Sequence, residues 1–304
     1  MGDEVRPLPR GLLQVIRTLH RLRVRGLGRL LMLIARHSRK LQMVPAPMED
    51  GRILFLDLRD PYQMPYFLEG RIPWEQGETE FVRRVVRSGD VVVDGGASIG
   101  WYTTLLAELV GPRGKVYAFE PNSYIYRLLT MTTEKYIQVK TVCAALGKRA
   151  EEKTLYIPFS GSFKASLTPL LCRQGTQKCH VVPLDEVLGT DRPVFIKLDI
   201  EGAELDALQG AKGVLQSPRP PIWMIEVSAG NLHRFGYKPV DLFRFFESFP
   251  HAEYACFRIR SEDGMCESLD GAAFERASSA MFYAAFVPKG LFYRVEGLLT
   301  TEGF

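Results

Sequence analysis

The spacing of apolar residues changes near residue 91, where short hydrophobic runs begin to alternate with segments of helical periodicity. We predict strands at 91–94, 115–120, 137–146, 194–200, 221–227, 252–259 and 279–288. Between them, the periodicity predicts helices at 101–110, 123–134, 203–215 and 239–248. Repeated strand–helix units predict a parallel sheet that is covered on both faces. The last two strands have no predicted helix between them, which favours an antiparallel end to the sheet.

The first forty residues have a different pattern. Residues 11–40 have helical spacing with arginines between the apolar positions, and Gly26 and Gly28 make two helices an alternative to one. The apolar positions that fall near one face are Leu12, Ile16, Leu19, Leu30 and Leu33. Such a basic amphipathic helix can lie on an anionic membrane surface, or it can pack on the domain or on a partner chain.

The next segment is expected to connect this extension to the sheet. Residues 44–51 have the composition of a linker, 53–60 predict a strand, and 61–76 predict irregular covering structure. Periodicity over 78–87 predicts a short helix. We therefore divide the chain into a basic helical extension with a linker (1–48), a covering segment (49–88) and an α/β domain (89–304).

Composition excludes few classes of function. The chain has 304 residues, of which 46% are hydrophobic and 24% charged, as in ordinary folded proteins. A net charge of +4 is too small to indicate nucleic acid as a partner. The basic residues are concentrated between Glu4 and Glu49, where no acidic residue occurs.

The cysteines and the N-terminal sequence favour a cytoplasmic protein. The five cysteines form no CxxC pair, so we predict neither a zinc site nor any other metal. Unpaired thiols are typical of a reducing compartment. Asp3 and Glu4 are unlike a secretory signal, and the apolar run at 30–35 is too short to span a bilayer. We expect a cytoplasmic protein, with contact at the inner membrane surface through 11–40 as an open alternative.

The junction after the first strand of the repeat, Asp94-Gly95-Gly96-Ala97-Ser98-Ile99-Gly100, is typical of a cofactor site. Ligands of open α/β sheets bind beyond the carboxyl ends of the strands, where glycines allow close approach. A dinucleotide site needs G-x-G-x-x-G, but the middle position here is Ala97. Asp94, Gly96 and Gly100 fit the turn of S-adenosylmethionine sites. Glu120 ends the next strand and can accept ribose hydroxyls, which supports a nucleoside ligand without choosing between the two cofactors.

The stretch KLDIEGAELDALQGA, together with VVVDGGASIGWYTTLL, GKVYAFEPN and VCAALG, resembles the FkbM family of S-adenosylmethionine-dependent methyltransferases. The resemblance extends from about Gly89 to Val287. It implies a class I methyltransferase fold, a Rossmann-like sheet of seven strands with the last antiparallel. It also implies methyl transfer to a hydroxyl of a sugar, a glycolipid or a secondary metabolite, with a small-molecule or glycan acceptor.

The resemblance further implies a set of cofactor-binding residues. Those expected at the methionine end are Asp94, Gly96, Ala97, Ser98 and Gly100. Glu120 is expected at the ribose with Asn122 nearby, Ala144 and Ala145 by the adenine, and Asp199 next to the methyl group. Family members commonly carry Asn where this chain has Ser98; a serine here can cap the following helix.

Proton removal from a hydroxyl needs a base within hydrogen-bond reach. Asp199 and Glu201, in the acidic signature, are candidate catalytic residues, and His233 is an alternative base. If the strand stays extended, Lys197, Asp199 and Glu201 project to one side. The purely structural alternative for Asp199 is a helix cap with an ion pair to Lys197.

Several other residues are candidates for the acceptor site. Glu226 ends the next strand and can join Asp199 in a two-carboxylate site, whereas Glu204 is expected to face solvent. Tyr66 and Trp74 can close the acceptor pocket, and 159–167 can form a flap or a plain hairpin.

Two other classes of function remain open. One is a nicotinamide-dependent oxidoreductase, against which Ala97 argues. The other is a membrane-associated protein that binds the cofactor without turnover. The sequence contains no pattern that indicates whether the protein is a monomer or an oligomer.

Overall fold

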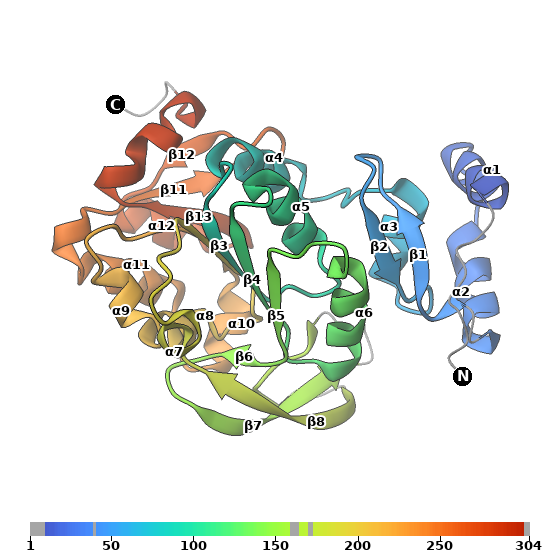
Figure 1. The fold of residues 1–304 in the computed structure, drawn as a ribbon, viewed down its shortest axis with the longest axis horizontal. Helices are drawn as coiled ribbons and strands as arrows, with labels where there is room; N and C mark the ends of the chain where they lie inside the picture. The colour runs from blue at the N-terminus through green and yellow to red at the C-terminus, as the bar shows by residue number, and fades with distance from the viewer. Residues whose placement is uncertain (1–9, 39–40, 159–163, 170–172, 301–304) are drawn as a thin grey trace.

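The computed structural model describes residues 10–38, 41–158, 164–169 and 173–300. In this part of the chain, an eight-stranded sheet forms the centre of the molecule (Figure 1). Its order is β12-β11-β13-β10-β9-β3-β4-β5, which are Cys266–Ser268, Ala255–Ile259, Phe282–Val287, Ile222–Val227, Phe195–Leu198, Val91–Gly95, Lys115–Phe119 and Val139–Val142.

The direction of the strands confirms the predicted class I methyltransferase sheet. β5, β4, β3, β9 and β10 are parallel neighbours, and β13 runs antiparallel to both β10 and β11. The edge strand β12 adds an eighth strand to the expected seven. A helix, α12 (Gly271–Ala277), also lies between β11 and β13, where we predicted none. Its start carries a cap, Asp270, whose side chain accepts a hydrogen bond from the Ala273 amide at 2.7 Å.

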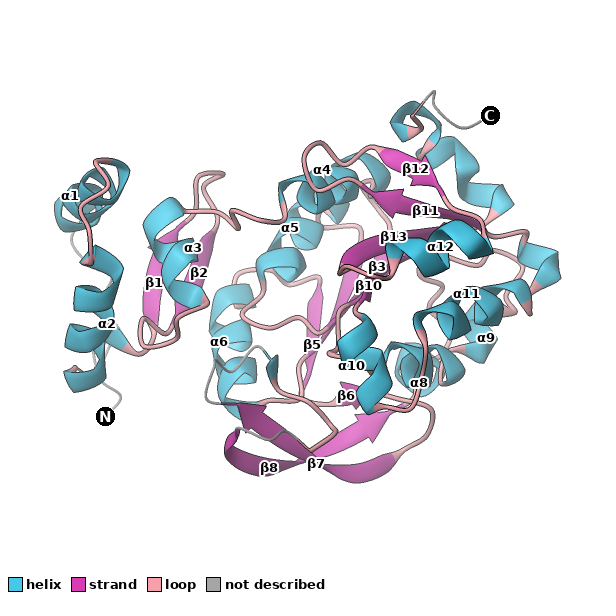
Figure 2. Cartoon of the chain, turned by 180° about the vertical axis from the view of Figure 1, so that it is seen from behind, coloured by secondary structure: helices cyan, strands magenta, loops and turns pink. Residues whose placement is uncertain are grey.

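Helices cover both faces of the sheet (Figure 2), and neighbouring strand residues pack in the two cores on either side of it. Val92 packs in a core with α4 (Gln76–Val85), α5 (Trp101–Val110) and α6 (Ser123–Thr133). Val93 packs in the opposite core, and the helices there are α7 (Leu184–Leu188), α8 (Glu204–Gln209), α9 (Lys212–Leu215), α10 (Ala229–Arg234), α11 (Pro239–Glu247) and α12. The 3-10 helices Pro250–Ala252, Lys289–Arg294 and Glu296–Leu298 complete the carboxyl-terminal part.

Two predicted elements are divided in the structure. The predicted helix at 203–215 becomes α8 and α9, which are separated at Gly210. A Cβ there would lie 2.0 Å from the Gly147 carbonyl oxygen, so the close packing requires glycine. The predicted strand at 137–146 becomes β5 and β6 (Ala145–Leu146). β6 joins a separate small sheet with β8 (Arg173–Val182) and β7 (Glu151–Pro158).

The amino-terminal extension forms two helices, α1 (Arg10–Arg21) and α2 (Leu27–His37), as the glycines allowed. They break at Gly26, which has a φ of +80°. Arg17 of α1 donates hydrogen bonds to the carbonyls of Phe67, at 3.0 Å, and Pro47, at 2.6 Å. The extension therefore packs against the covering segment rather than against the central sheet (Figure 1).

The apolar face of the extension differs from the expected one. Leu13 and Ile16 are buried, whereas Leu12, Leu30 and Leu33 are about half exposed. No helix in the described part of the chain is long and apolar enough to cross a membrane.

The covering segment contains more regular structure than we predicted. The predicted linker contains a strand, β1 (Val44–Pro47), which pairs antiparallel with β2 (Ile53–Leu56). The proline-rich composition of this segment is not typical of a strand. The strand forms nonetheless, and its residues Val44 and Ala46 are buried. The predicted irregular structure contains α3 (Gln63–Glu69), in which a proline occupies the first turn, where helices tolerate it.

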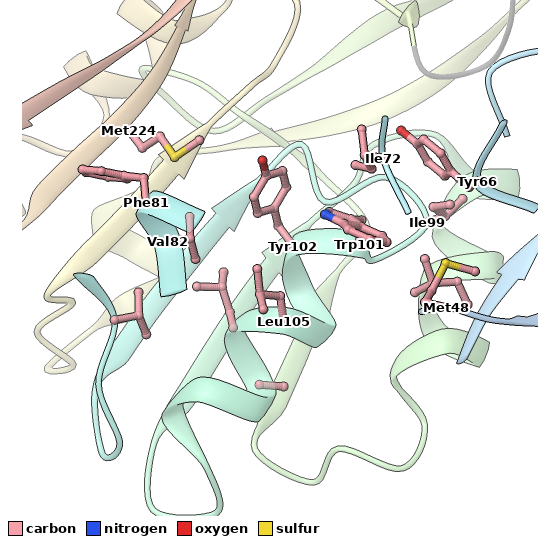
Figure 3. Close-up of a cluster of buried hydrophobic side chains, with 14 of the residues drawn as sticks. Met48, Tyr66, Ile72, Phe81, Val82, Ile99, Trp101, Tyr102, Leu105 and Met224 are labelled. Carbon is pink, nitrogen blue, oxygen red and sulfur yellow. The ribbon is translucent and has the colours of Figure 1, made fainter. Parts of the chain in front are cut away.

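Apolar residues of the covering segment pack directly on α5 (Figure 3). The labelled side chains around the start of this helix include Met48, Tyr66 and Ile72 next to Trp101. A fully buried arginine, Arg52, donates hydrogen bonds to the Trp101 carbonyl oxygen, at 2.5 Å, and to Thr104 Oγ1, at 2.9 Å. The hairpin is thereby joined to the helix that follows the glycine-rich junction.

Candidate functional site

The glycine-rich junction between β3 and α5 has a backbone that only certain residues adopt easily. Gly96 has a φ of +79°, and a Cβ there would lie 1.9 Å from the Asp199 carbonyl oxygen. Gly100 has a φ of +95° and precedes α5. The two glycines therefore allow the junction to lie against the end of β9.

Ser98 has a left-handed backbone with a φ of +50°, which is uncommon for a residue other than glycine, asparagine or aspartate. Its amide donates a hydrogen bond to Glu120 Oε2 at 3.0 Å. Its hydroxyl oxygen is buried and has no hydrogen-bond partner, so the expected helix cap is wrong. The backbone strain and the unpartnered hydroxyl both distinguish this position.

A cavity of about 430 Å³ opens at the carboxyl ends of β3, β4 and β9, which is within the usual range for small-molecule sites. Eight of the predicted site residues line it: Gly96, Ala97, Ser98, Glu120, Ala144, Ala145, Asp199 and Glu201. The structure therefore brings together, in one cavity, residues that are a hundred positions apart in the chain.

Four predicted residues lie outside the lining of this cavity. Asp94 is buried and accepts a hydrogen bond from Thr103 Oγ1 at 2.6 Å. Gly100 begins α5, and Asn122 caps α6 by accepting hydrogen bonds from two backbone amides. His233 of α10 lines a separate depression, so we no longer propose it as a base. Asn231 is the residue of α10 that contacts Glu201, and His233, two residues further along, lies about 200° around the helix axis from it.

Glu120 lies at the end of β4 with both carboxylate oxygens bound to the backbone. Oε1 accepts from the Asn122 amide at 2.8 Å, and Oε2 accepts from the Ser98 amide at 3.0 Å. Burial raises its pKa to about 7, and the two amides oppose that rise. The carboxyl group is thus held in a fixed orientation in the cavity wall.

Asp199 occupies the wall after β9. Its Oδ2 accepts hydrogen bonds from Lys197 Nζ, at 3.1 Å, and from the Tyr283 hydroxyl, at 2.7 Å. The structural alternative is therefore half correct: the ion pair exists, but α8 has no side-chain cap. Burial lowers the pKa of Lys197, and the carboxylates of Asp199, Asp94 and Glu75 outweigh it, so the net shift is upward.

Glu201 reaches the cavity although the strand does not stay extended. β9 ends at Leu198, and Glu201 has a left-handed backbone with a φ of +58°. Its Oε2 accepts a hydrogen bond from Asn231 Nδ2 at 2.9 Å. Burial, with a contribution from Asp199, raises its pKa to about 7.

Glu204 does not face solvent as expected. It is buried, and its Oε1 accepts hydrogen bonds from the amides of Ile200, at 3.1 Å, and Gly202, at 3.2 Å. The tight turn after β9 leaves these amides without helical partners, so the glutamate side chain folds back to bind them.

Several lining residues come from outside the predicted set. Glu226 lines the cavity, and its Oε2 is buried without a hydrogen-bond partner; we had considered it only as a companion of Asp199. The sequence analysis missed Glu75 and Tyr283. Burial raises the pKa of Glu75 to about 7, and Asp199 adds to the shift. No local motif marks Glu75, because its role depends on the covering segment folding over the strand ends.

The two aromatic residues suggested to close the acceptor pocket lie at the cavity, and the suggested flap is described only in part. Tyr66 and Trp74 both line the cavity, as we had suggested. Lys164 and Leu167 of the suggested flap line it too, whereas 159–163 lie outside the described residues.

Comparisons with known proteins identify the family of the chain. The family model described as the methyltransferase FkbM domain matches residues 94–255, more than half of the chain. The hexuronic acid methyltransferase AglP of Haloferax volcanii is 25% identical over 165 residues, which cover 51% of this chain and 64% of the relative. The chain thus spans less than two thirds of that relative's length.

Solved structures of methyltransferases are similar to the chain only at low identity and low TM-score. A SAM-dependent methyltransferase from Aquifex aeolicus is 14% identical with a TM-score of 0.41, covering 75% of this chain and 94% of its own. The fibrillarin of Aeropyrum pernix, with natively bound S-adenosyl-L-methionine, is 10% identical with a TM-score of 0.41, covering 79% and 92%. With the matched family model, the strand order and the glycine-rich junction, the chain belongs to the FkbM family of S-adenosylmethionine-dependent methyltransferases.

Proposed function

We propose that the protein transfers a methyl group from S-adenosylmethionine to a hydroxyl of a sugar, a glycolipid or a secondary metabolite. The observation that carries this proposal is the single cavity that joins the glycine-rich junction and Glu120 to the carboxylates after β9. The relative's name, hexuronic acid methyltransferase, supports an acceptor of the sugar class.

The residues of the junction fit the cofactor. At Gly96 the backbone comes so close to Asp199 that no side chain fits, which leaves the cavity beside it open. The hydroxyl oxygen of Ser98 lacks a partner, and Glu120 presents a fixed carboxyl that can accept ribose hydroxyls. Ala144 and Ala145 offer a small apolar surface suited to the adenine.

The bound cofactor supplies a methyl group on a sulfonium: the acceptor oxygen bonds to the methyl carbon, the carbon–sulfur bond breaks, and its electron pair stays on sulfur. Asp199 and Glu201 are placed to take the hydroxyl proton. Glu201, whose pKa is about 7, suits a base that works near neutral pH. Lys197 and Tyr283 hold Asp199 in position.

The test of this proposal is titration of the full-length protein with S-adenosylhomocysteine and with NAD, followed by a labelled-methyl assay on a cell extract. We expect binding of the first compound alone, and label in an acceptor that carries a hydroxyl. Binding of NAD in preference to S-adenosylhomocysteine would refute the proposal and support the oxidoreductase alternative.

We also propose that α1 and α2 contact an anionic membrane surface. Their exposed large apolar residues, with the loop between them, are Leu12, Val15, Leu22, Val24, Leu30, Leu33 and Ile34. Basic residues accompany them, and no acidic residue occurs between Glu4 and Glu49. An apolar surface with basic neighbours is the pattern of interfacial helices.

Vesicle binding tests the membrane proposal. Full-length protein should co-sediment with vesicles that contain anionic phospholipid and much less with neutral vesicles. The double change Leu30→Ser and Leu33→Ser should reduce this binding several-fold, whereas Ile137→Ser, at a residue of the catalytic domain that is 91% exposed, should not. Equal sedimentation of the double variant and the native protein would exclude this surface.

A further inference from the structure

The cavity is rich in carboxyl groups. Glu75, Glu226 and the pair Asp199 and Glu201 line it from three segments of the chain. Two lysines, Lys164 and Lys197, also line it, and they are outnumbered by the carboxyl groups. Lys197 is occupied by its ion pair with Asp199, at 3.1 Å.

Glu226 lacks the partners that a buried carboxyl needs. Its Oε2 is buried and accepts no hydrogen bond from the protein. Leaving a buried acceptor without a donor is unfavourable, because its hydrogen bonds to water are lost without replacement. A ligand that donates a hydrogen bond to this oxygen would remove that cost, and a hydroxyl group is such a donor.

Aromatic side chains also line the cavity. Trp74 is 46% exposed, and its ring centroid lies 5.8 Å from that of Tyr66, which lies 6.2 Å from that of Trp101. The indole Nε1 of Trp101 is buried without a hydrogen-bond partner. Aromatic faces and unpartnered polar atoms in one cavity suit a ligand that is apolar on one side and carries hydroxyls on the other.

We infer that Glu75 and Glu226 make the acceptor site selective for uncharged, hydroxyl-bearing acceptors and exclude acceptors that carry a carboxylate near the methylated position. This inference rests on the proposed function of the same cavity. It distinguishes between neutral and anionic sugars, which the family relationship leaves open.

The physical reason is the charge that an anionic acceptor would add. A further negative charge in a buried site interacts strongly because the effective dielectric constant is low. Burial already raises the pKa of Glu75 to about 7 and that of Glu226 well above its usual range. An anionic acceptor would force these groups to take up protons, and this uptake becomes more costly as the pH rises above 7. A neutral acceptor has no such requirement.

The groups that surround the two glutamates set this pH dependence. Around Glu75 they are Asp199, Lys197, Tyr102, Glu78, Tyr66 and Tyr283; around Glu226 they are Asp199, Glu201, Glu204, Lys197, Lys164 and Tyr283. Negative groups predominate in both sets. At both glutamates, therefore, a rise in pH makes binding of an anionic acceptor less favourable.

The experiment compares matched glycosides. Methyl glycosides of glucose, galactose and mannose, and the corresponding methyl uronosides, are titrated into full-length protein saturated with S-adenosylhomocysteine, at pH 6 and pH 8.5. We expect at least one neutral glycoside to bind about tenfold or more tightly than its uronic acid partner at pH 8.5, and the ratio to fall at pH 6.

Two variants assign the selectivity to the named residues. Glu75→Gln and Glu226→Gln should each reduce the ratio several-fold at pH 8.5 and leave S-adenosylhomocysteine binding intact. Glu186→Gln, at an exposed site on α7, should change neither. Binding of S-adenosylhomocysteine shows that a variant is folded. If a variant is not folded, the ratio of neutral to anionic glycoside affinities in the native protein still tests the inference.

Some outcomes overturn the inference and leave the proposed function in place. These are equal or tighter binding of the uronosides, or no glycoside binding at all by protein that binds S-adenosylhomocysteine. Failure to bind S-adenosylhomocysteine would instead refute the proposed function.

Discussion

At the scale of single residues, the junction depends on positions where side-chain size and backbone conformation both matter. Gly96→Ala places a Cβ 1.9 Å from the Asp199 carbonyl oxygen on a backbone with a φ of +79°. We expect a loss of about 2 kcal/mol or more in the free energy of unfolding, and at least a tenfold loss in S-adenosylhomocysteine affinity.

Chemical denaturation and calorimetric titration measure the two effects of Gly96→Ala. Gly230→Ala is the matched control, because no atom lies within 4 Å of the added Cβ and its φ is not positive. A native-like Gly96→Ala variant would mean that the junction is not tightly packed on β9.

Glu120→Gln tests the proposed ribose contact. The amide keeps the shape of the side chain but removes the charge, and charged hydrogen bonds contribute about 1.5–3 kcal/mol each. We expect S-adenosylhomocysteine to bind about 10- to 100-fold more weakly, with Glu186→Gln unchanged. Because ionised Glu120 is the better acceptor and its pKa is about 7, binding to the native protein should also release protons at pH 6. Unchanged affinity in titrations of the variant would remove Glu120 from the site.

Ser98 shows what a motif can and cannot reveal. The family resemblance marks this position as unusual because asparagine is common there, but it does not explain the preference. The structure supplies a reason in the φ of +50°, which asparagine tolerates better than serine. The expectation of a helix cap is wrong because Ser98 lies three residues before Trp101, the first residue of α5, and its hydroxyl finds no partner.

At the scale of elements, Arg52 fastens the β1–β2 hairpin to α5. Its side chain is fully buried, forms an ion pair with Asp50 at 2.8 Å, and lies over the Trp101 ring at 4.3 Å. Arg52→Met leaves the Trp101 carbonyl without this donor and Asp50 with a weaker partner. We expect a loss of about 3 kcal/mol in the free energy of unfolding.

The control for Arg52→Met is Arg83→Met, which also contacts Asp50, at 3.1 Å, but from a more exposed side chain. This variant should lose less than about 1 kcal/mol. Urea denaturation measures both variants, and equal losses would show that burial of Arg52 contributes nothing special.

Elements with strong periodicity could be predicted, and those defined by distant contacts could not. The helix predicted at 101–110 has the bounds of α5, because its mostly apolar residues follow a clear strand and a glycine-rich turn. The hairpin strand β1 was missed because two of its four residues are prolines. Likewise, Glu75 acquires its place only when the segment around it folds over the ends of β9 and β10.

At the scale of the whole molecule, the buried carboxyl groups couple stability to pH. Burial raises the pKa of Glu75, Glu120, Glu201 and Glu204 to about 7 each. A carboxyl whose pKa is raised on folding binds more protons in the native state, so stability is present at low pH and is lost as the pH rises toward 7. The ligand-free protein should therefore lose stability between about pH 5 and pH 7.5.

Differential scanning calorimetry measures this trend. We expect the Tm of the ligand-free protein to fall by about 5 °C or more between pH 5.5 and pH 7.5, and to change little above that. The Glu204→Gln variant should show a smaller fall, because one of the four groups no longer titrates. A Tm that rises over this interval would contradict the assigned burial of these carboxyls.

The walls of the cavity have separate origins in the chain. Gly96, Glu120 and Asp199 belong to the region that the family model matches, whereas Glu75 and Tyr283 lie outside it. Glu226 of the acceptor wall also lies inside the matched region, so only the part of that wall that Glu75 and Tyr283 contribute can change while the matched region stays the same. Two members of the family can keep the same methyl donor while mutations in the polypeptide that flanks the shared region redirect them to new metabolites.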